Sequence, residues 1–589
     1  MSYKGALFFL LGLLLSLSLF YLFSPSSKFK SKKEEIPVLT TGKPELCLLC
    51  HEEKIPEKAH AREVLGCSSC HLGNPLTPTM SEAHKGLVKN PSDLRVIEKT
   101  CGKANCHPQD VKKVRKSLMA TNHGIITRLL KVFEEKEILQ AFPNIKVADL
   151  YEKNSLLDKS YALDYFRKLC GSCHLYLQKE KFEGFLAEKG GGCSACHLEG
   201  SKEDLKRKKI HPGLTKKIHL NKCVKCHNRS GRIGFTYQGL YETSQGGIYD
   251  RLWVDGRQLK EIEPDVHFKS SLQCIDCHTR EEVMGDGNFY KNLEEALEVT
   301  CETCHLWELK TKKGRPLSQL IKTKKGVFLK RKIDEKLLPV KRPSPVCQEK
   351  IHSRLSCSAC HAKYMPQCMG CHVRLTPGDT QLDKIKAKET KGLWEEHESY
   401  RVLEDPPLVV KGNKIVPVTP GCQDFVTLLD NKGEPKKYFE SITWAHIEPH
   451  STQKKGRSCK SCHQNPKALG LGYGQIILNH GQISFYALEK PITQKENISL
   501  SQIVDLEGRT LVKFNRREMR GFTKEELKKA KSYNAGFAYI LKKYDYSLSF
   551  KIKALIRPIL GAIYWGLKGD FKRVVYQYYK FLGRIQGWF

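Results

Sequence analysis

The chain has 589 residues, of which 40% are hydrophobic and 28% are charged, and its mean hydropathy is -0.45. That is little apolar side chain for a chain of this length, so something else must help to fill its core. Its 24 cysteines are too sparse for a small disulfide scaffold and too many for a typical cytosolic enzyme. The formal charge of +35 favours an acidic partner or an anionic membrane surface. Nucleic acid is disfavoured, because the sequence has no arginine-aromatic RNA motif and no helix-turn-helix signature.

The chain begins with an apolar segment. Residues 6–23 are apolar apart from small Gly and Ser, and they are followed by a polar run. This pattern predicts an export signal or membrane anchor in 1–27, followed by a linker in 28–44. An uncleaved anchor is favoured, because no A-x-A cleavage site follows. Four lysines, at positions 28, 30, 32 and 33, conflict with the positive-inside rule if the body is exported. Export is kept because the cysteine chemistry requires it.

A cysteine motif dominates the rest of the chain. Cys-x-x-Cys-His occurs ten times, and every Cys-x-x-Cys in the sequence is followed by His. A wider variant with four residues between its cysteines makes the third of eleven motifs in chain order. The motifs are Cys47/Cys50/His51, Cys67/Cys70/His71, Cys101/Cys106/His107, Cys170/Cys173/His174, Cys193/Cys196/His197, Cys223/Cys226/His227, Cys274/Cys277/His278, Cys301/Cys304/His305, Cys357/Cys360/His361, Cys368/Cys371/His372 and Cys459/Cys462/His463.

This spacing suits covalent haem. Two thioethers must reach the two vinyl groups on one porphyrin edge, and the next residue must turn its imidazole under the iron. A zinc ribbon also uses paired Cys-x-x-Cys, but it gains nothing from a His directly after each pair. Thioredoxin-type redox motifs would not repeat ten times. The motifs therefore predict about eleven covalently attached haem c groups.

Over about residues 45–470 the chain resembles the multihaem cytochrome c superfamily. The resemblance implies stacked or edge-on haem pairs that form an electron wire. It also accounts for the wider third motif, since small multihaem cytochromes of sulfate reducers use that variant.

The histidines outside the motifs are as numerous as the motifs. Of 22 histidines, eleven are not in a motif: His60, His84, His123, His211, His219, His267, His352, His397, His446, His450 and His480. Each is a candidate second axial ligand, although several could be ordinary surface residues. We expect most irons to be bis-His, low-spin and closed to substrates.

Five of these histidines lie shortly before a motif: His60, His219, His267, His352 and His450. A tether of four to nine residues would hardly carry a histidine to the far face of its own haem. Each is therefore expected to ligate a neighbouring iron. Individual pairings cannot be deduced from the sequence.

The expected fold is a mainly α and coil body packed around haems, with little regular sheet. In chain order we expect haems 1–3 in 45–125, a helical spacer in 126–165, haems 4–8 in 166–310, a basic linker in 311–345 and haems 9–11 in 346–474. A small α/β cap in 475–535 and a basic amphipathic tail in 536–589 follow.

The linker could instead dock an acidic partner. The tail could bind a membrane or pack on the body. Cys347 and Cys422 belong to no motif, and they fit a disulfide, free thiols or, less readily, a sulfur ligand.

These features favour an electron carrier of the periplasm or cell surface, anchored to the inner membrane. It would relay electrons between a quinol pool or small cytochromes and a terminal or extracellular acceptor, with acidic cytochromes or quinol-linked membrane proteins as partners. The alternative is a multihaem reductase or oxidase of a nitrogen or sulfur oxyanion with one open haem. The segment between His372 and Cys459 is where an odd haem would be sought. A polymerising filament is a third possibility, against which the anchor and the basic tail argue.

Overall fold

A computed structural model describes residues 36–51, 53, 55, 58–199, 211–229, 232–243, 246–365, 368–400, 403–463, 465–479, 482–488, 498–499, 501–531, 548–568 and 570–586. The chain divides into two compact units, Met1–Val88 and Lys89–Phe589. The expected anchor at 6–23 and the candidate ligand His480 lie outside the described residues.

The first unit carries motifs one and two on short helical turns. Its elements are η1 (Leu46–Leu49), η2 (Lys58–His60), α2 (Arg62–Leu65), α3 (Ser68–His71) and α4 (Met80–Ala83). The buried carboxylate of Glu45 accepts hydrogen bonds from the backbone N–H of Ser68 at 3.3 Å and from its hydroxyl at 2.7 Å. Gly66, with φ of 68°, passes so close to Glu45 that a Cβ there would lie 2.2 Å from the carboxylate. This contact joins the two motifs.

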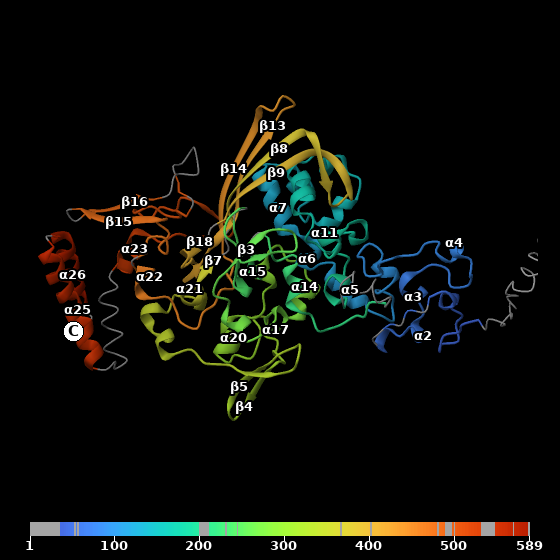
Figure 1. Cartoon of the computed structure of the whole chain (residues 1–589), viewed down its shortest axis with the longest axis horizontal. Helices are drawn as coiled ribbons and strands as arrows, with labels where there is room; N and C mark the ends of the chain where they lie inside the picture. The colour runs from blue at the N-terminus through green and yellow to red at the C-terminus, as the bar shows by residue number, and fades with distance from the viewer. Residues whose placement is uncertain are drawn as a thin grey trace, which may run out of the picture. The chain divides into compact units, whose positions relative to one another are not determined.

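Short helices make up much of the second unit (Figure 1). They include η3 (Ile97–Lys99), α5 (Pro108–Val114), α6 (Leu118–Thr121), α7 (His123–Val132), α8 (Lys136–Ala141), η4 (Val147–Tyr151), α9 (Ser155–Asp158), α10 (Tyr161–Tyr165), η5 (Phe166–Cys170), η6 (Lys179–Lys181), α11 (Gly184–Ala187), α12 (Ser194–His197), α14 (Leu220–Val224), α15 (Ile233–Gln238), α16 (Val266–Lys269), α17 (Cys274–Cys277), α18 (Arg280–Met284), α19 (Leu293–Ala296), α20 (Cys301–His305), η7 (Pro345–Gln348), η8 (Lys350–His352), α21 (Cys357–His361), α22 (Cys459–His463) and α23 (Lys524–Lys531).

A five-stranded sheet contradicts the expected mainly α and coil body with little regular sheet. Its strand order is β17-β14-β13-β8-β9, formed by β8 (Cys368–Asp383), β9 (Lys388–Tyr400), β13 (Thr419–Leu429), β14 (Pro435–Ala445) and β17 (Lys513–Phe514). β8 runs parallel to β13 and antiparallel to β9. The long strands β8, β9, β13 and β14 run beside one another (Figure 1). The fold class predicted from the sequence was therefore wrong.

One face of this sheet completes the largest hydrophobic core. Val373, Leu375, Trp394 and Phe439 pack in one cluster with apolar residues of α7 and α10, among them Leu130. This burial explains the sheet, because apolar side chains on alternate residues of β8 need a covering layer. The covering helices α7 and α10 lie at the two ends of the segment 126–165, where the sequence predicted a helical spacer, and α7 begins three residues earlier at His123.

Smaller sheets lie along the chain. They are β1-β3-β2, made of β1 (Leu240–Glu242), β2 (Arg251–Leu252) and β3 (Gln258–Glu261); β4-β5-β6, made of β4 (Leu320–Thr323), β5 (Gly326–Lys330) and β6 (Leu337–Pro339); β12-β11-β18, made of β11 (Leu408–Lys411), β12 (Lys414–Pro417) and β18 (Met519–Arg520); β15 (Gly474–Asn479) with β16 (Gln482–Ala487); and β7 (Tyr364–Met365) with β10 (Leu403–Glu404).

The segment 311–345, expected as a basic linker, contains the meander β4-β5-β6. Leu320, Val327 and Leu329 bury its inner face in a core of their own. The lysines and arginines of this segment are therefore displayed on a folded element.

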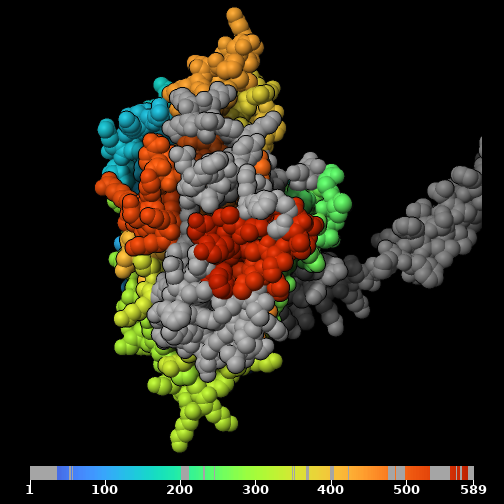
Figure 2. Space-filling view, turned by 90° about the vertical axis from the view of Figure 1, so that its left-hand side faces the viewer, coloured from blue at the N-terminus to red at the C-terminus, as the bar shows by residue number. Residues whose placement is uncertain are grey.

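The chain's last described elements are two helices, α25 (Leu548–Leu567) and α26 (Phe571–Gln586). They lie together on one surface of the molecule, coloured red in Figure 2. Among the described residues, no helix is both long and apolar enough to cross a membrane.

Replacing Gly192 by alanine should lower the free energy of unfolding by about 3 kcal/mol or more. Gly192 has φ of +67°, and a Cβ there would lie 1.7 Å from the carbonyl oxygen of Ser92. Gly314 is the matched control, since its φ is +77° and nothing lies within 4 Å of its Cβ position. Gly314→Ala should cost only the backbone strain, about 1–2 kcal/mol. Denaturant unfolding followed by circular dichroism measures both, and equal losses would contradict the close approach.

Candidate haem-attachment sites

Most motifs close into one helical turn. The backbone N–H of the motif histidine donates to the carbonyl of the first cysteine at 2.8–3.0 Å in His51, His71, His107, His197, His227 and His278. Three further motifs lie entirely within α20, α21 and α22. The fourth motif instead begins at Cys170, the last residue of the π-helical turn η5. The turn places two thiols and an imidazole on one short stretch, as attachment along a single porphyrin edge requires.

The second cysteines of the first three motifs depart from the expectation of a haem-packed interior. Cys50 and Cys106 are exposed, and Cys70 is half-buried. The backbone N–H of Cys50 and of Cys70 donates to the carbonyl of the first cysteine of its motif at 3.2 Å. The N–H of Cys106 donates instead to the Lys103 carbonyl at 2.9 Å, because four residues separate the cysteines of motif three. A porphyrin attached at Cys50 or Cys106 would therefore have an edge near solvent, and haem binding by these three cysteines stays a prediction.

Many of the histidines are oriented through Nδ1. A carbonyl oxygen cannot donate, so an Nδ1 that contacts one must carry the proton, which leaves Nε2 with a lone pair. Such Nδ1–carbonyl contacts of 2.7–2.9 Å are made by His71 to Val88, His123 to Ile145, His197 to Thr215, His211 to Pro212, His305 to Lys341, His361 to Gln453 and His450 to Glu448. Metal-binding histidines use this arrangement to fix the tautomer and the direction of the ring.

Carboxylates hold two more rings in the same way. Nδ1 of His278 lies 2.6 Å from Oε1 of Glu282, and Nδ1 of His267 lies 2.9 Å from Oδ1 of Asp265. Burial would lower the pKa of His278, but its hydrogen bond to Glu282 raises it overall. A carboxylate partner also makes an imidazole a stronger metal ligand.

Four motif histidines face a histidine from outside the motifs at nearly one separation. The ring centres are 6.2 Å apart for His51 and His84, 6.2 Å for His267 and His305, 6.1 Å for His278 and His450, and 6.2 Å for His352 and His463. A metal held between two imidazoles lies about 2 Å from each coordinating nitrogen, so the ring centres come to lie roughly 6 Å apart. Two rings that only pack against each other would have no reason to share this separation of about 6 Å. The four pairs therefore fit bis-His iron.

Three of these pairs concern histidines that lie shortly before a motif. His267 precedes motif seven but faces His305 of motif eight. His352 precedes motif nine but faces His463 of motif eleven, and His450 precedes motif eleven but faces His278 of motif seven. Each thus lies opposite the histidine of another motif, in the arrangement expected from the short tethers.

The remaining candidate ligands occupy varied positions. His60 ends η2, His211 is partly buried, and His219 precedes α14. His123 is 4% exposed at the start of α7, with its ring edge-on to Phe289 at 5.2 Å. His397 is exposed on β9. His397 is the cross-strand partner of the motif histidine His372 in the β8–β9 pair.

His446 lies in an ion-pair cluster instead. Its Nδ1 is 3.3 Å from Oε1 of Glu294, and its Nε2 is 3.4 Å from Oε1 of Glu448. Burial would raise the pKa of Glu294, but its contacts with His446, Lys411 and Arg516 lower it to about 2. With a carboxylate near each nitrogen, His446 is the candidate that least resembles an iron ligand.

Motif four has a different environment. His174 is 3% exposed, and its Nε2 is buried without a hydrogen-bond partner among the described residues. Burial lowers the pKa of His174 to about 3, so it is neutral, the form that binds metal. The rings beside it belong to Phe166, stacked at 6.4 Å and 20°, and to Tyr151, edge-on at 6.5 Å. Neither ring offers a nitrogen.

Motif ten does not fit the attachment geometry. Cys368, Cys371 and His372 lie in the extended strand β8, which pairs with both β9 and β13. The His372 ring stacks on Phe425 at 4.8 Å, and the buried Cys371 thiol donates to Glu396 at 3.2 Å. A strand cannot present two thiols and an imidazole as the helical turns do.

Cysteines of different motifs lie near one another. They are close enough to interact electrostatically in the pairs Cys101–Cys193, Cys196–Cys223, Cys223–Cys274, Cys277–Cys304, Cys301–Cys357 and Cys360–Cys462. This proximity places motifs three, five, six, seven, eight, nine and eleven in one series. Cys173 contacts Cys226, which adds motif four as a branch at motif six. In the first unit, Cys47 neighbours Cys67.

Two cysteines lie outside the motifs. Cys347 is exposed in η7 with a free thiol, and the Cys422 side chain lies outside the described residues.

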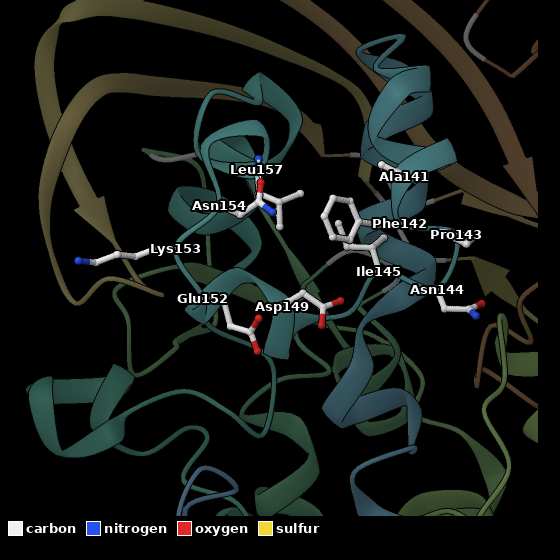
Figure 3. A pocket seen from close by; sticks show the side chains of 10 residues that line it. All are labelled: Ala141, Phe142, Pro143, Asn144, Ile145, Asp149, Glu152, Lys153, Asn154 and Leu157. Carbon is white, nitrogen blue, oxygen red and sulfur yellow. Dashed lines mark hydrogen bonds between the residues drawn. The ribbon is translucent and has the colours of Figure 1, made fainter.

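A cavity of about 310 Å³ opens beside α8 and α9 and is lined by Phe142, Ile145 and Asp149 among others (Figure 3). Figure 3 shows apolar and charged side chains around it, without a cysteine or histidine.

Comparison with known proteins gave no match to any family model, curated protein or solved structure. Within the described residues, no three His, Cys, Asp or Glu side chains converge to hold a metal ion. The motifs and their histidine partners are therefore the features that indicate the function.

Replacing His267 by alanine should convert one low-spin haem into a high-spin haem. The change removes the ring opposite His305 while leaving motif eight intact. His397→Ala is the control, because that histidine is exposed on β9 opposite His372, whose motif forms a strand and no attachment turn. Electron paramagnetic resonance of the oxidised, haem-loaded proteins measures the difference. A fully low-spin His267→Ala protein would mean that His267 is not an axial ligand.

Serine at both Cys368 and Cys371 should leave the number of covalent haems unchanged, because β8 holds motif ten in an extended form. Serine at both Cys301 and Cys304 should remove one haem, since α20 forms the attachment turn. Intact-protein mass spectrometry counts the haems in each case. Loss of one haem from the Cys368/Cys371 variant would show that motif ten folds as a turn in the loaded protein.

Proposed function

We propose that the chain is a multihaem c-type cytochrome that relays electrons outside the cytoplasm. The observation that carries this proposal is the set of four histidine pairs at 6.1–6.2 Å, each with one member in a Cys-x-x-Cys-His motif. Covalent haem c held at these motifs would supply one-electron redox centres.

The protein's own residues hold and separate these centres. The cysteines would hold each haem covalently, and the paired histidines would bind its iron from both sides. Histidines on both sides would exclude a substrate, and the bound haem would supply electron exchange alone. The series of neighbouring motifs from three to eleven supports transfer over a distance rather than storage at isolated sites.

The proposed partners follow from charge and from export. Haems at the ten motifs other than motif ten would add up to about 20 propionate charges, which leaves part of the +35 unbalanced. The remaining positive charge suits acidic small cytochromes or quinol-linked membrane proteins as partners. The apolar run at residues 6–23 supports attachment to the inner membrane with the haem body in the periplasm or at the cell surface.

Motif four supports a second candidate function, reduction or oxidation of a small nitrogen or sulfur oxyanion at one open haem. The aromatic rings next to His174 are those of Phe166 and Tyr151, which cannot supply a nitrogen ligand. An iron held there by His174 alone would keep one position for a small molecule.

Carbon monoxide binding to the reduced, haem-loaded protein separates the two functions. A conduit should bind none, and all of its ferric haems should be low-spin. The enzyme should bind about one equivalent per chain, and serine at both Cys170 and Cys173 should abolish that binding. The matched pair Cys274 and Cys277 belongs to a motif with a histidine pair, so serine there should leave it unchanged. A purified protein without covalent haem would overturn both proposals.

A further inference from the structure

The helices α25 and α26 form an antiparallel hairpin with its own packing contact. They are joined near Asp570, whose backbone N–H donates to the carbonyl of Trp565 at 2.9 Å. The helices approach so closely at Gly561 that a Cβ there would lie 3.0 Å from the Gln577 side chain. The two helices therefore contact each other at Gly561. The other faces of the hairpin do not take part in this contact.

An apolar stripe of α25 faces outward. Ile559, Leu560, Ile563, Tyr564 and Leu567 recur with helical spacing, and each is exposed, Leu567 to 84%. In water such a stripe would be expected to carry polar side chains. The neighbouring helix α26 continues the exposed apolar and aromatic surface with Val575, Tyr576, Tyr578 and Tyr579. In Figure 2 a large part of α25 and α26, coloured red, lies on the surface toward the viewer.

Cations accompany the aromatic rings of this surface. The Arg573 guanidinium lies 4.0 Å from the Trp565 ring centre, the Lys568 ammonium 5.0 Å from Tyr564 and the Lys580 ammonium 4.6 Å from Tyr576. Residues 551–589 contain eight Lys or Arg and one acidic residue, Asp570. Apolar, aromatic and basic groups thus gather on these two helices.

We propose that the outer face of the α25–α26 hairpin binds the surface of an anionic lipid bilayer. Tyrosine and tryptophan rings favour the headgroup region, where one end of the ring is apolar and the other is wet. Long basic side chains keep their charge among anionic headgroups while their stems cover apolar surface. An acidic protein partner would account for the cations, but it would not require the exposed aliphatic stripe of α25. This proposal does not depend on the haem proposal.

Binding of the whole protein to vesicles would not report on the hairpin, because the apolar segment at residues 6–23 would itself hold every variant on a vesicle. The test therefore measures protection within the hairpin. The full-length, haem-loaded protein is reconstituted with phosphatidylglycerol-containing vesicles or with pure phosphatidylcholine vesicles. Hydrogen–deuterium exchange is then followed in peptides from α25 and α26. Exchange in these peptides should be at least tenfold slower on the anionic vesicles than on the neutral ones.

Two sets of variants identify the groups responsible. Leu560→Ser, Ile563→Ser and Leu567→Ser together should abolish the protection. Ile248→Ser, Leu252→Ser and Val254→Ser form the matched control, because those side chains are also exposed but lie around β2. Lys568→Gln with Arg573→Gln should lower the preference for anionic vesicles about tenfold. Equal exchange on both kinds of vesicle, or protection that requires an added acidic protein, would overturn the proposal.

Discussion

Much of the structure depends on one geometric constraint, which is that the rings of two histidines lie with their centres about 6 Å apart. It joins positions far apart in the sequence, such as His278 and His450, whose ring centres lie 6.1 Å apart. Each ring must also be aimed, which Glu282 does for the first and the Glu448 carbonyl for the second. The motif helices are only four or five residues long. Such short helices let the chain turn often enough to bring distant histidines together.

The hydrophobic core reflects the same constraint. Buried apolar residues form four separate clusters among the described residues rather than one continuous core. Motif cysteines border three of these clusters, for example Cys101, Cys304 and Cys462. Porphyrins attached there would add apolar surface where the clusters end. Such added surface would supplement a chain in which only 40% of the residues are hydrophobic.

The candidate attachment motifs could be found in the sequence because they are local. The two cysteines and the histidine of a motif lie within a few residues, so spacing alone identifies the candidates, although motif ten folds as a strand. The partner of His352 could not be deduced, because a tertiary contact places it opposite His463. The five-stranded sheet was missed, although Val373 and Leu375 alternate with exposed Arg374 in the pattern of a strand covered on one side. The strand was not predicted because the same segment contains motif ten, whose cysteines and histidine predict a helical turn for haem attachment.

The sheet has a structural role at motif four. The π-helical turn η5 ends at Cys170, and residues just before it are clamped to the sheet. Lys168 donates to the carbonyl of Gly392 at 2.7 Å, and Arg167 lies 3.1 Å from the Asp383 carboxylate. Trp394 holds Asp164 through a 2.8 Å hydrogen bond. π-Turns cost regular hydrogen bonding and are often retained at functional sites. A sheet that fixes this turn and stacks Phe166 against His174 therefore makes motif four a specialised site within a body otherwise built from repeated turns.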